Sequence, residues 1–234
     1  MNTYSRYWLL TALLLCGVIY LVWSGTAAWG IAKFPEAAVR GAVLFVLAVF
    51  LYTYGYEGHG VARMLSKNEM VLPLLARGTG GSEAAAEISV CLHKTASLRR
   101  VGATAPIRQA DFSVLYYRQK EAFEHALTAG IDRIESYRNG LFFLGLAFTA
   151  AAIVAAFAAQ MIPTNSEEAR LYSFAIIKAL GLSYTATLAC LSSMVVLYVL
   201  GTMLRARADQ LIDACDGLLY ETAILGLTRS GSHA

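Results

Sequence analysis

Charged residues are scarce in this sequence. Only 15% of its 234 residues are Asp, Glu, Lys or Arg, whereas 57% are apolar. The net charge of +3 is small, and no cluster of Lys and Arg alternates with aromatic residues, so no nucleic-acid partner is expected. Prolines are also few: there are four, and none lies between residues 107 and 162. That long interval therefore permits an unbroken helix.

Cysteine and histidine are too few and too dispersed to indicate a metal site or a disulfide framework. There are four of each, and none stands at the spacing of a zinc site or a CxxC pair. The sequence also lacks a Gly-rich phosphate-binding loop, a GxSxG motif and an HExxH motif. We therefore expect no metal, no other cofactor and no enzymatic activity.

The apolar residues are concentrated in four stretches without charge, at 7–32, 41–56, 139–166 and 179–204. A helix needs about 20 residues to cross roughly 30 Å of hydrocarbon, and each stretch with its flanks supplies them. The second stretch is short, so a re-entrant turn is the alternative to a span in which Arg40 extends to the interface. The first is too long for a secretory signal core and predicts an uncleaved anchor. The sequence thus predicts an all-α membrane protein with four transmembrane helices.

Most of the charge lies between the second and third stretches. Residues 57–138 carry eleven Lys or Arg and nine Asp or Glu, and positive charge favours the cytoplasmic side. This segment, the C-terminal tail and both termini are therefore expected in the cytoplasm. The chain accordingly divides into two N-terminal transmembrane helices (1–56), a cytoplasmic helical segment (57–138), a second transmembrane pair (139–204) and a cytoplasmic amphipathic helix with a tail (205–234).

The cytoplasmic segment combines predicted helix breaks with a long apolar stripe. Breaks are expected at Pro73, at the GTGGS sequence of 78–82 and at Pro106, and residues 83–98 are rich in helix formers. Asp111 is the predicted N-cap of a helix that continues through the third span. Apolar residues follow at helical spacing, at Phe112, Tyr116, Phe123, Leu127, Ile131 and Ile134. The fourth span is predicted to continue similarly beyond 205, and the two extensions are expected to pack together.

Small and hydroxyl residues distinguish the last two spans. Gly145, Ala152 and Ala156 recur along one face of the third span, and small residues allow helices to approach closely in lipid. These three residues are therefore predicted to pack against a neighbouring helix. The fourth span contains several hydroxyl residues and one charge, at Lys178, Ser183, Thr185, Thr187, Ser192 and Ser193.

Two short motifs stand in these spans. The first is GLAFT, Gly145 to Thr149, and the second is KALGLSYTATLAC, residues 178–190. Together with the amphipathic tail, they make residues 120–227 resemble the MotA/TolQ/ExbB family, whose members have Gly-Leu-x-Gly-Thr and Ala-Leu followed by a hydroxyl residue. Phe148 replaces the second Gly, the proline usual shortly before that motif is absent, and Lys178 stands where ExbB-like members tend to carry an acid. The four-span arrangement is similar to that of MotA.

This resemblance implies a channel and stator subunit of an ion-driven motor in the bacterial inner membrane. Its third and fourth spans would line the pore of a homopentamer, around a dimer of single-span helices like MotB, ExbD or TolR. Ions, usually protons, would pass by an acid on that partner and hydroxyls on the ring. On this basis Thr149, Ser183 and Thr185 are expected on the ion pathway, and Lys178 is expected to face the partner.

Each of these assignments has a plainer alternative. Thr149 could bond only to the Gly145 carbonyl one turn back, and Lys178 could extend to the membrane interface. Ser183 and Thr185 differ by about 200° around a helix, so both cannot face one narrow pore equally. For the whole protein, the alternative is a non-transporting four-span scaffold or effector that binds a partner through its cytoplasmic helices. A channel without a partner subunit is a third reading.

Overall fold

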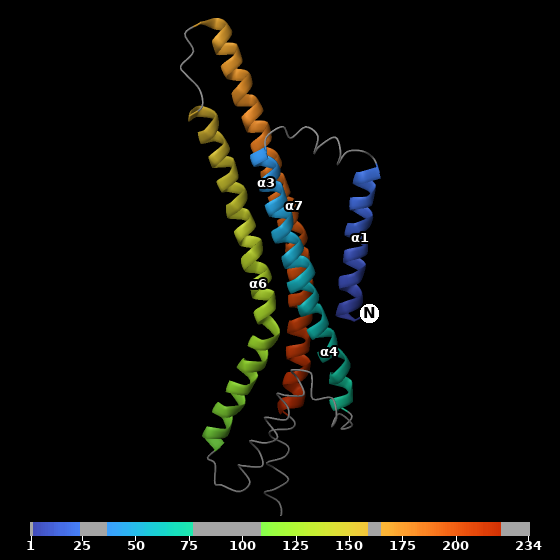
Figure 1. Ribbon diagram of the computed structural model, residues 1–234. Coiled ribbons are helices and arrows are strands. Elements are labelled where there is room, and N and C mark those ends of the chain that lie inside the picture. The colour runs from blue at the N-terminus through green and yellow to red at the C-terminus, as the bar shows by residue number, and fades with distance from the viewer. Residues whose placement is uncertain (1, 24–36, 77–108, 159–164, 221–234) are drawn as a thin grey trace, which may run out of the picture. The chain divides into compact units, whose positions relative to one another are not determined.

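A computed structural model describes residues 2–23, 37–76, 109–158 and 165–220 (Figure 1). They form, in chain order, the helices α1 (Thr3–Trp23), α3 (Ala37–Leu51), the π-helix η1 (Tyr52–Gly58), α4 (His59–Ala76), α6 (Gln109–Ala158) and α7 (Ser166–Tyr220). Within these ranges the chain contains helices and no strand, so the all-α prediction is confirmed.

Two compact units share these helices. Unit 1 comprises residues 1–8, 58–132 and 202–234, and unit 2 comprises residues 9–57 and 133–201. Both α6 and α7 contribute one part to each unit, because each helix is continuous across the boundary. Unit 2 contains both motifs and therefore the candidate site.

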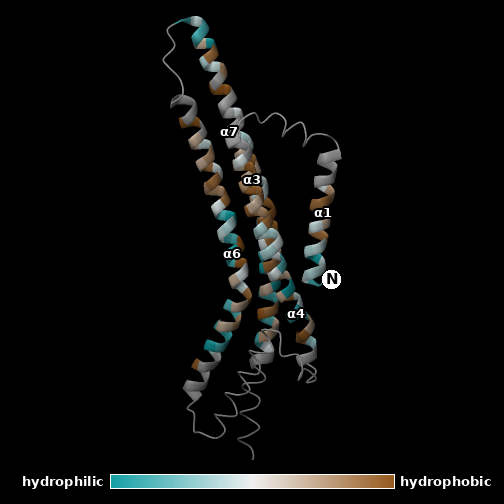
Figure 2. Cartoon of the chain, in the orientation of Figure 1, coloured by the Kyte–Doolittle hydropathy of each residue, from teal (hydrophilic) through white to brown (hydrophobic). Residues whose placement is uncertain are grey.

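Two helical stretches of the described residues are long and apolar enough to cross a membrane. They are Gly41–Pro73, which runs through α3, η1 and α4, and Tyr184–Gly217 in α7. In Figure 2 hydrophobic residues predominate along α3 and in the later part of α6, whereas hydrophilic residues recur along its first part. By length and composition, these stretches indicate a membrane-associated helical protein.

The proline-free interval forms one helix, as predicted. α6 runs from Gln109 to Ala158, and α7 likewise continues from the apolar stretch to Tyr220. The prediction of Asp111 as the N-cap was wrong, because Asp111 lies inside α6, which begins at Gln109.

The predicted apolar stripe of α6 contributes to the core of unit 1. Phe123, Leu127 and Ile131 are buried, and the next stripe residue, Ile134, is buried in unit 2. The other buried apolar residues described in unit 1 lie in α1, α4 and α7: Tyr7, Val61, Ala62, Leu65, Val71, Leu204, Ala208, Leu211 and Cys215. The extension of the fourth span thus has the buried apolar face expected from its spacing.

The predicted break at Pro73 was wrong. α4 continues through Pro73 to Ala76. Proline lacks the N–H that would bond to the carbonyl of Glu69, but only three residues of α4 follow, so the lost bond affects only the last turn. The GTGGS sequence, the helix expected at 83–98 and Pro106 lie outside the described residues.

A π-helix that the sequence analysis did not predict joins α3 to α4. η1 spans Tyr52–Gly58, and π-helical turns inside helices are frequently found at functional sites. Its Glu57 side chain is only 8% exposed and pairs with Arg133 of α6, at 3.4 Å between Oε2 and Nη2. The pair links the N-terminal helices of unit 2 to α6.

Candidate functional site

In unit 2, α6 and α7 run antiparallel in a constant register. Arg138, Gly145 and Thr149 of α6 contact Tyr198, Cys190 and Thr187 of α7, respectively. Steps of seven and four residues along α6 thus correspond to steps of eight and three residues back along α7. Contacts at intervals of about one or two turns are typical of two helices packed side by side.

Gly145 lies where the two helices are closely packed. A Cβ atom at this position would lie 3.1 Å from Cys190 Cβ and 3.6 Å from Cys190 Sγ. The missing side chain at the first position of the GLAFT motif therefore lets α7 pack directly against α6 without displacing Cys190. Ala152 and Ala156, predicted to share this packing face, lie in α6, but their side chains are outside the described part of the structure.

Next to Gly145, two threonines form a bond between the helices. Thr149 Oγ1 lies 2.6 Å from Thr187 Oγ1. Thr149 also donates to the Gly145 carbonyl at 3.1 Å, and Thr187 reaches the same carbonyl at 3.3 Å. We call these three oxygen atoms the hydroxyl triangle.

The number of protons decides what the hydroxyl triangle offers to a ligand. Each threonine hydroxyl has one proton to donate and two lone pairs that accept. A hydroxyl that donates its proton to another protein oxygen keeps lone pairs that can accept a hydrogen bond. Both side chains are only partly buried. The triangle therefore suits a proton donor or a cation better than a carboxylate anion.

The predicted ion-pathway residues have different positions. Thr149 donates to the Gly145 carbonyl one turn back, as the alternative without an ion pathway predicts. It also forms a hydrogen bond to a residue of α7. Its partner is Thr187, which was not predicted to lie on the ion pathway. Thr185 is partly buried on α7. Ser183 and Lys178 belong to α7 as well, but their side chains lie outside the described part.

One sequence signal could have found Thr187. It stands four residues after Ser183, which is one helical turn, so the two positions share a face of α7. The resemblance drew attention to the first hydroxyl after Ala-Leu, whereas α6 contacts the hydroxyl one turn later.

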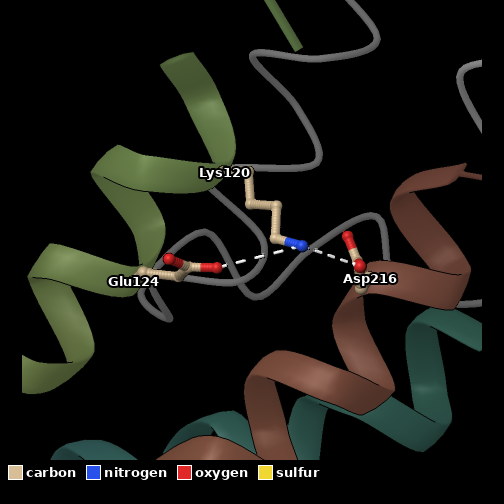
Figure 3. A network of polar contacts seen from close by, with 3 residues as sticks. All are labelled: Lys120, Glu124 and Asp216. Carbon is tan, nitrogen blue, oxygen red and sulfur yellow. Dashed lines mark hydrogen bonds and ion pairs between the residues drawn. The ribbon is translucent and has the colours of Figure 1, made fainter. Parts of the chain in front are cut away.

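Ion pairs connect α6 and α7 in unit 1. Lys120 Nζ lies 2.8 Å from Asp216 Oδ2 and 3.9 Å from Glu124 Oε1 (Figure 3). The hydrogen bond to Asp216 raises the pKa of the Lys120 ammonium above its ordinary value, against a smaller opposing effect of desolvation. Arg205 pairs with Asp132 at 2.5 Å. These charged contacts lie in a different unit from the hydroxyl triangle.

Among the described residues, no group of three or more His, Cys, Asp or Glu side chains is placed to hold a metal ion. No family model, curated protein or solved structure matches this chain. The chemistry of the site is therefore inferred from the geometry of Gly145, Thr149 and Thr187.

Proposed function

We propose that this protein is a channel and stator subunit of a proton-driven motor in the bacterial inner membrane. In this proposal the chain crosses the membrane four times, with both termini in the cytoplasm. Five copies surround a dimer of single-span helices of the MotB, ExbD or TolR kind, and ion flow drives rotation of one part within the other. The observation that carries the proposal is the hydroxyl triangle, set between two long helices within their uncharged stretches.

Hydroxyl groups fit ion passage through an apolar region. A charged side chain is expensive to place there, whereas a hydroxyl binds or relays an ion at little cost. Because the hydroxyl triangle offers lone pairs, it would accept a hydrogen bond from a protonated carboxylic acid or from a hydrated proton. An acid on the partner helix would then carry the charge, and the triangle would position it.

The exposed surface of α7 supports assembly with other helices. Large apolar side chains recur along α7 at helical spacing and are exposed in the single chain: Leu171, Phe174, Ile177, Tyr184, Leu188, Leu191 and Val195. Such a surface requires lipid or protein around it. In the proposed ring, neighbouring subunits, the partner dimer and membrane lipid would share it.

The proposal is tested by proton flux through the complex reconstituted with its single-span partner. Thr149→Val and Thr187→Val each keep the side-chain shape and remove one hydroxyl of the triangle. Loss of a hydrogen bond of about 1–2 kcal/mol corresponds to a roughly 5- to 30-fold slower rate. We expect both variants to assemble and to lose flux by at least that factor, and Thr149→Ser to retain part of it.

Thr128→Val is the matched control. Thr128 Oγ1 also donates to a carbonyl one turn back in α6, that of Glu124 at 3.0 Å, but it lies in unit 1. If Thr149→Val and Thr187→Val conduct like Thr128→Val, the hydroxyl triangle serves helix packing only. That result would favour the alternative, a non-transporting scaffold or effector with the same four spans.

A further inference from the structure

Four tyrosines from three helical segments lie at one level of unit 2. Tyr52 and Tyr56 of η1 stack with ring centroids 5.4 Å apart, and Tyr137 of α6 meets Tyr52 edge-on at 5.9 Å. On α7, the Tyr198 ring lies under the Arg138 guanidinium, 5.4 Å from its centroid. The four tyrosines are between 37% and 69% exposed. We call these four residues the tyrosine cluster.

The tyrosine cluster coincides with a change of polarity. Arg138, directly after Tyr137, is the last charged residue of α6. After the exposed Asn139 and Gly140, the next exposed side chains on α6 are apolar, beginning with Phe142, Phe143 and Leu146. On the other side of the cluster, η1 ends with the Glu57–Arg133 ion pair described above. The cluster therefore lies between a charged level and an apolar one.

We propose that the tyrosine cluster contacts the phospholipid headgroups on the cytoplasmic side and thereby fixes how deeply the chain sits in the membrane. Tyrosine suits this position because its ring is apolar and its hydroxyl forms hydrogen bonds, which is why tyrosine is enriched at both interfaces of membrane proteins. Phospholipid headgroups are the expected contact, because the change from charged to apolar side chains at the cluster matches the change from water to hydrocarbon across the headgroup region. The inference rests on the proposed function, in which these helices span the bilayer.

The depth of the hydroxyl triangle follows from this anchor. Thr149 stands eleven residues after Arg138, and Thr187 stands eleven residues before Tyr198. At about 1.5 Å per residue, both threonines lie roughly 16 Å from the anchor, close to the middle of about 30 Å of hydrocarbon. A charged side chain is most costly at the bilayer centre, so an ion-binding hydroxyl is most favourable there in place of a charged group.

The same anchor assigns a depth to Lys178. It stands twenty residues before Tyr198 on α7, a rise of about 30 Å, so this position reaches the opposite interface. The lysine is then at the level of headgroups and water, where its charge needs no partner acid. This favours the interface reading of Lys178 over a contact with the partner subunit.

Spin-label accessibility in lipid vesicles tests the anchor. The native cysteines are replaced by Ala in the full chain, assembled with its partner, and single nitroxide labels are placed at Tyr56, Leu51 or Leu44. All three side chains are well exposed, and Leu44 lies twelve residues from Tyr56, about 18 Å along the helix. Collision with oxygen, which concentrates in the acyl chains, is compared with collision with a water-soluble nickel chelate.

We expect the ratio of oxygen to nickel accessibility to be low at Tyr56, intermediate at Leu51 and highest at Leu44. A ratio as high at Tyr56 as at Leu44 would place the tyrosine cluster among acyl chains and overturn the inference alone. A label at Tyr56 hidden from both reagents, with Leu44 open to oxygen, would also overturn it, because protein would then cover the cluster. High nickel accessibility at all three positions would instead defeat the spanning topology and with it the proposed function.

Discussion

Substituting Gly145 by alanine tests the close packing on which the candidate site depends. The added Cβ atom would lie 3.1 Å from Cys190 Cβ and 3.9 Å from Thr187 Cα. The first separation is shorter than an ordinary contact, and Cys190 is buried, so α7 must shift by a few tenths of an ångström. That shift acts on Thr187 and hence on the 2.6 Å hydroxyl contact to Thr149.

The net effect on stability is the difference between two opposing contributions. Inserting a methyl group into a packed interface costs about 1–3 kcal/mol, while alanine in place of glycine inside a helix favours folding by roughly 0.5–1 kcal/mol. Gly145→Ala should therefore destabilise the chain by about 0–2.5 kcal/mol. Gly140 on the same helix is the matched control, because nothing lies within 4 Å of a Cβ atom there, and Gly140→Ala should stabilise by about 0.5–1 kcal/mol.

The assay is denaturant unfolding of the full chain in detergent, with both variants measured side by side. We expect Gly145→Ala to be less stable than Gly140→Ala by about 1–3 kcal/mol. In a double-mutant cycle, Gly145→Ala should cost less in the Cys190→Gly background, which lacks the opposing Cβ and Sγ atoms, than in the wild-type background. Equal stability of the two single variants would refute the close approach of α6 and α7 at Gly145.

Three further outcomes are expected. In denaturant unfolding, Arg133→Ala should destabilise the chain by about 1–3 kcal/mol, because it leaves the buried Glu57 carboxylate without this ion pair. Adding Glu57→Gln to the same chain should recover part of that loss, and no recovery would contradict the pairing. Because the pKa of Lys120 is raised in the folded chain, its contribution to stability is complete below pH 10.5, the unfolded-state pKa, and is lost as the pH rises through the higher folded-state pKa. In thermal unfolding, the stability advantage of wild type over Lys120→Gln should therefore decline only above pH 10.5. A decline of that advantage at neutral pH would refute this cause. Lys178→Gln should keep wild-type proton flux and Lys178→Arg should do the same; a loss in the Gln variant alone would place this charge against an acid of the partner.

Features that depend on one helix were predictable from the sequence. The spacing of Phe123, Leu127 and Ile131 identified a buried face, because side-chain direction in a helix follows from residue number. The absence of proline between residues 107 and 162 similarly predicted the continuous α6. The error at Pro73 arose because the cost of a proline depends on how many residues of the helix follow it.

Features that depend on two helices were less predictable. Which hydroxyl of α7 meets Thr149 is set by the register between α6 and α7, in which Gly145 lies against Cys190. Periodicity gives the face of each helix but not this offset, so Thr187 was missed. The π-helix was missed for a related reason: one extra residue in a turn leaves no periodic signal, and the burial of Glu57 depends on packing against α6.

The arrangement of the purified complex tests the central claim most directly. Electron cryo-microscopy of this chain with its single-span partner should show five copies around two central helices, with Thr149 and Thr187 of each copy facing the enclosed space. An assembly without central helices, or one in which both threonines face lipid, would contradict the proposed channel.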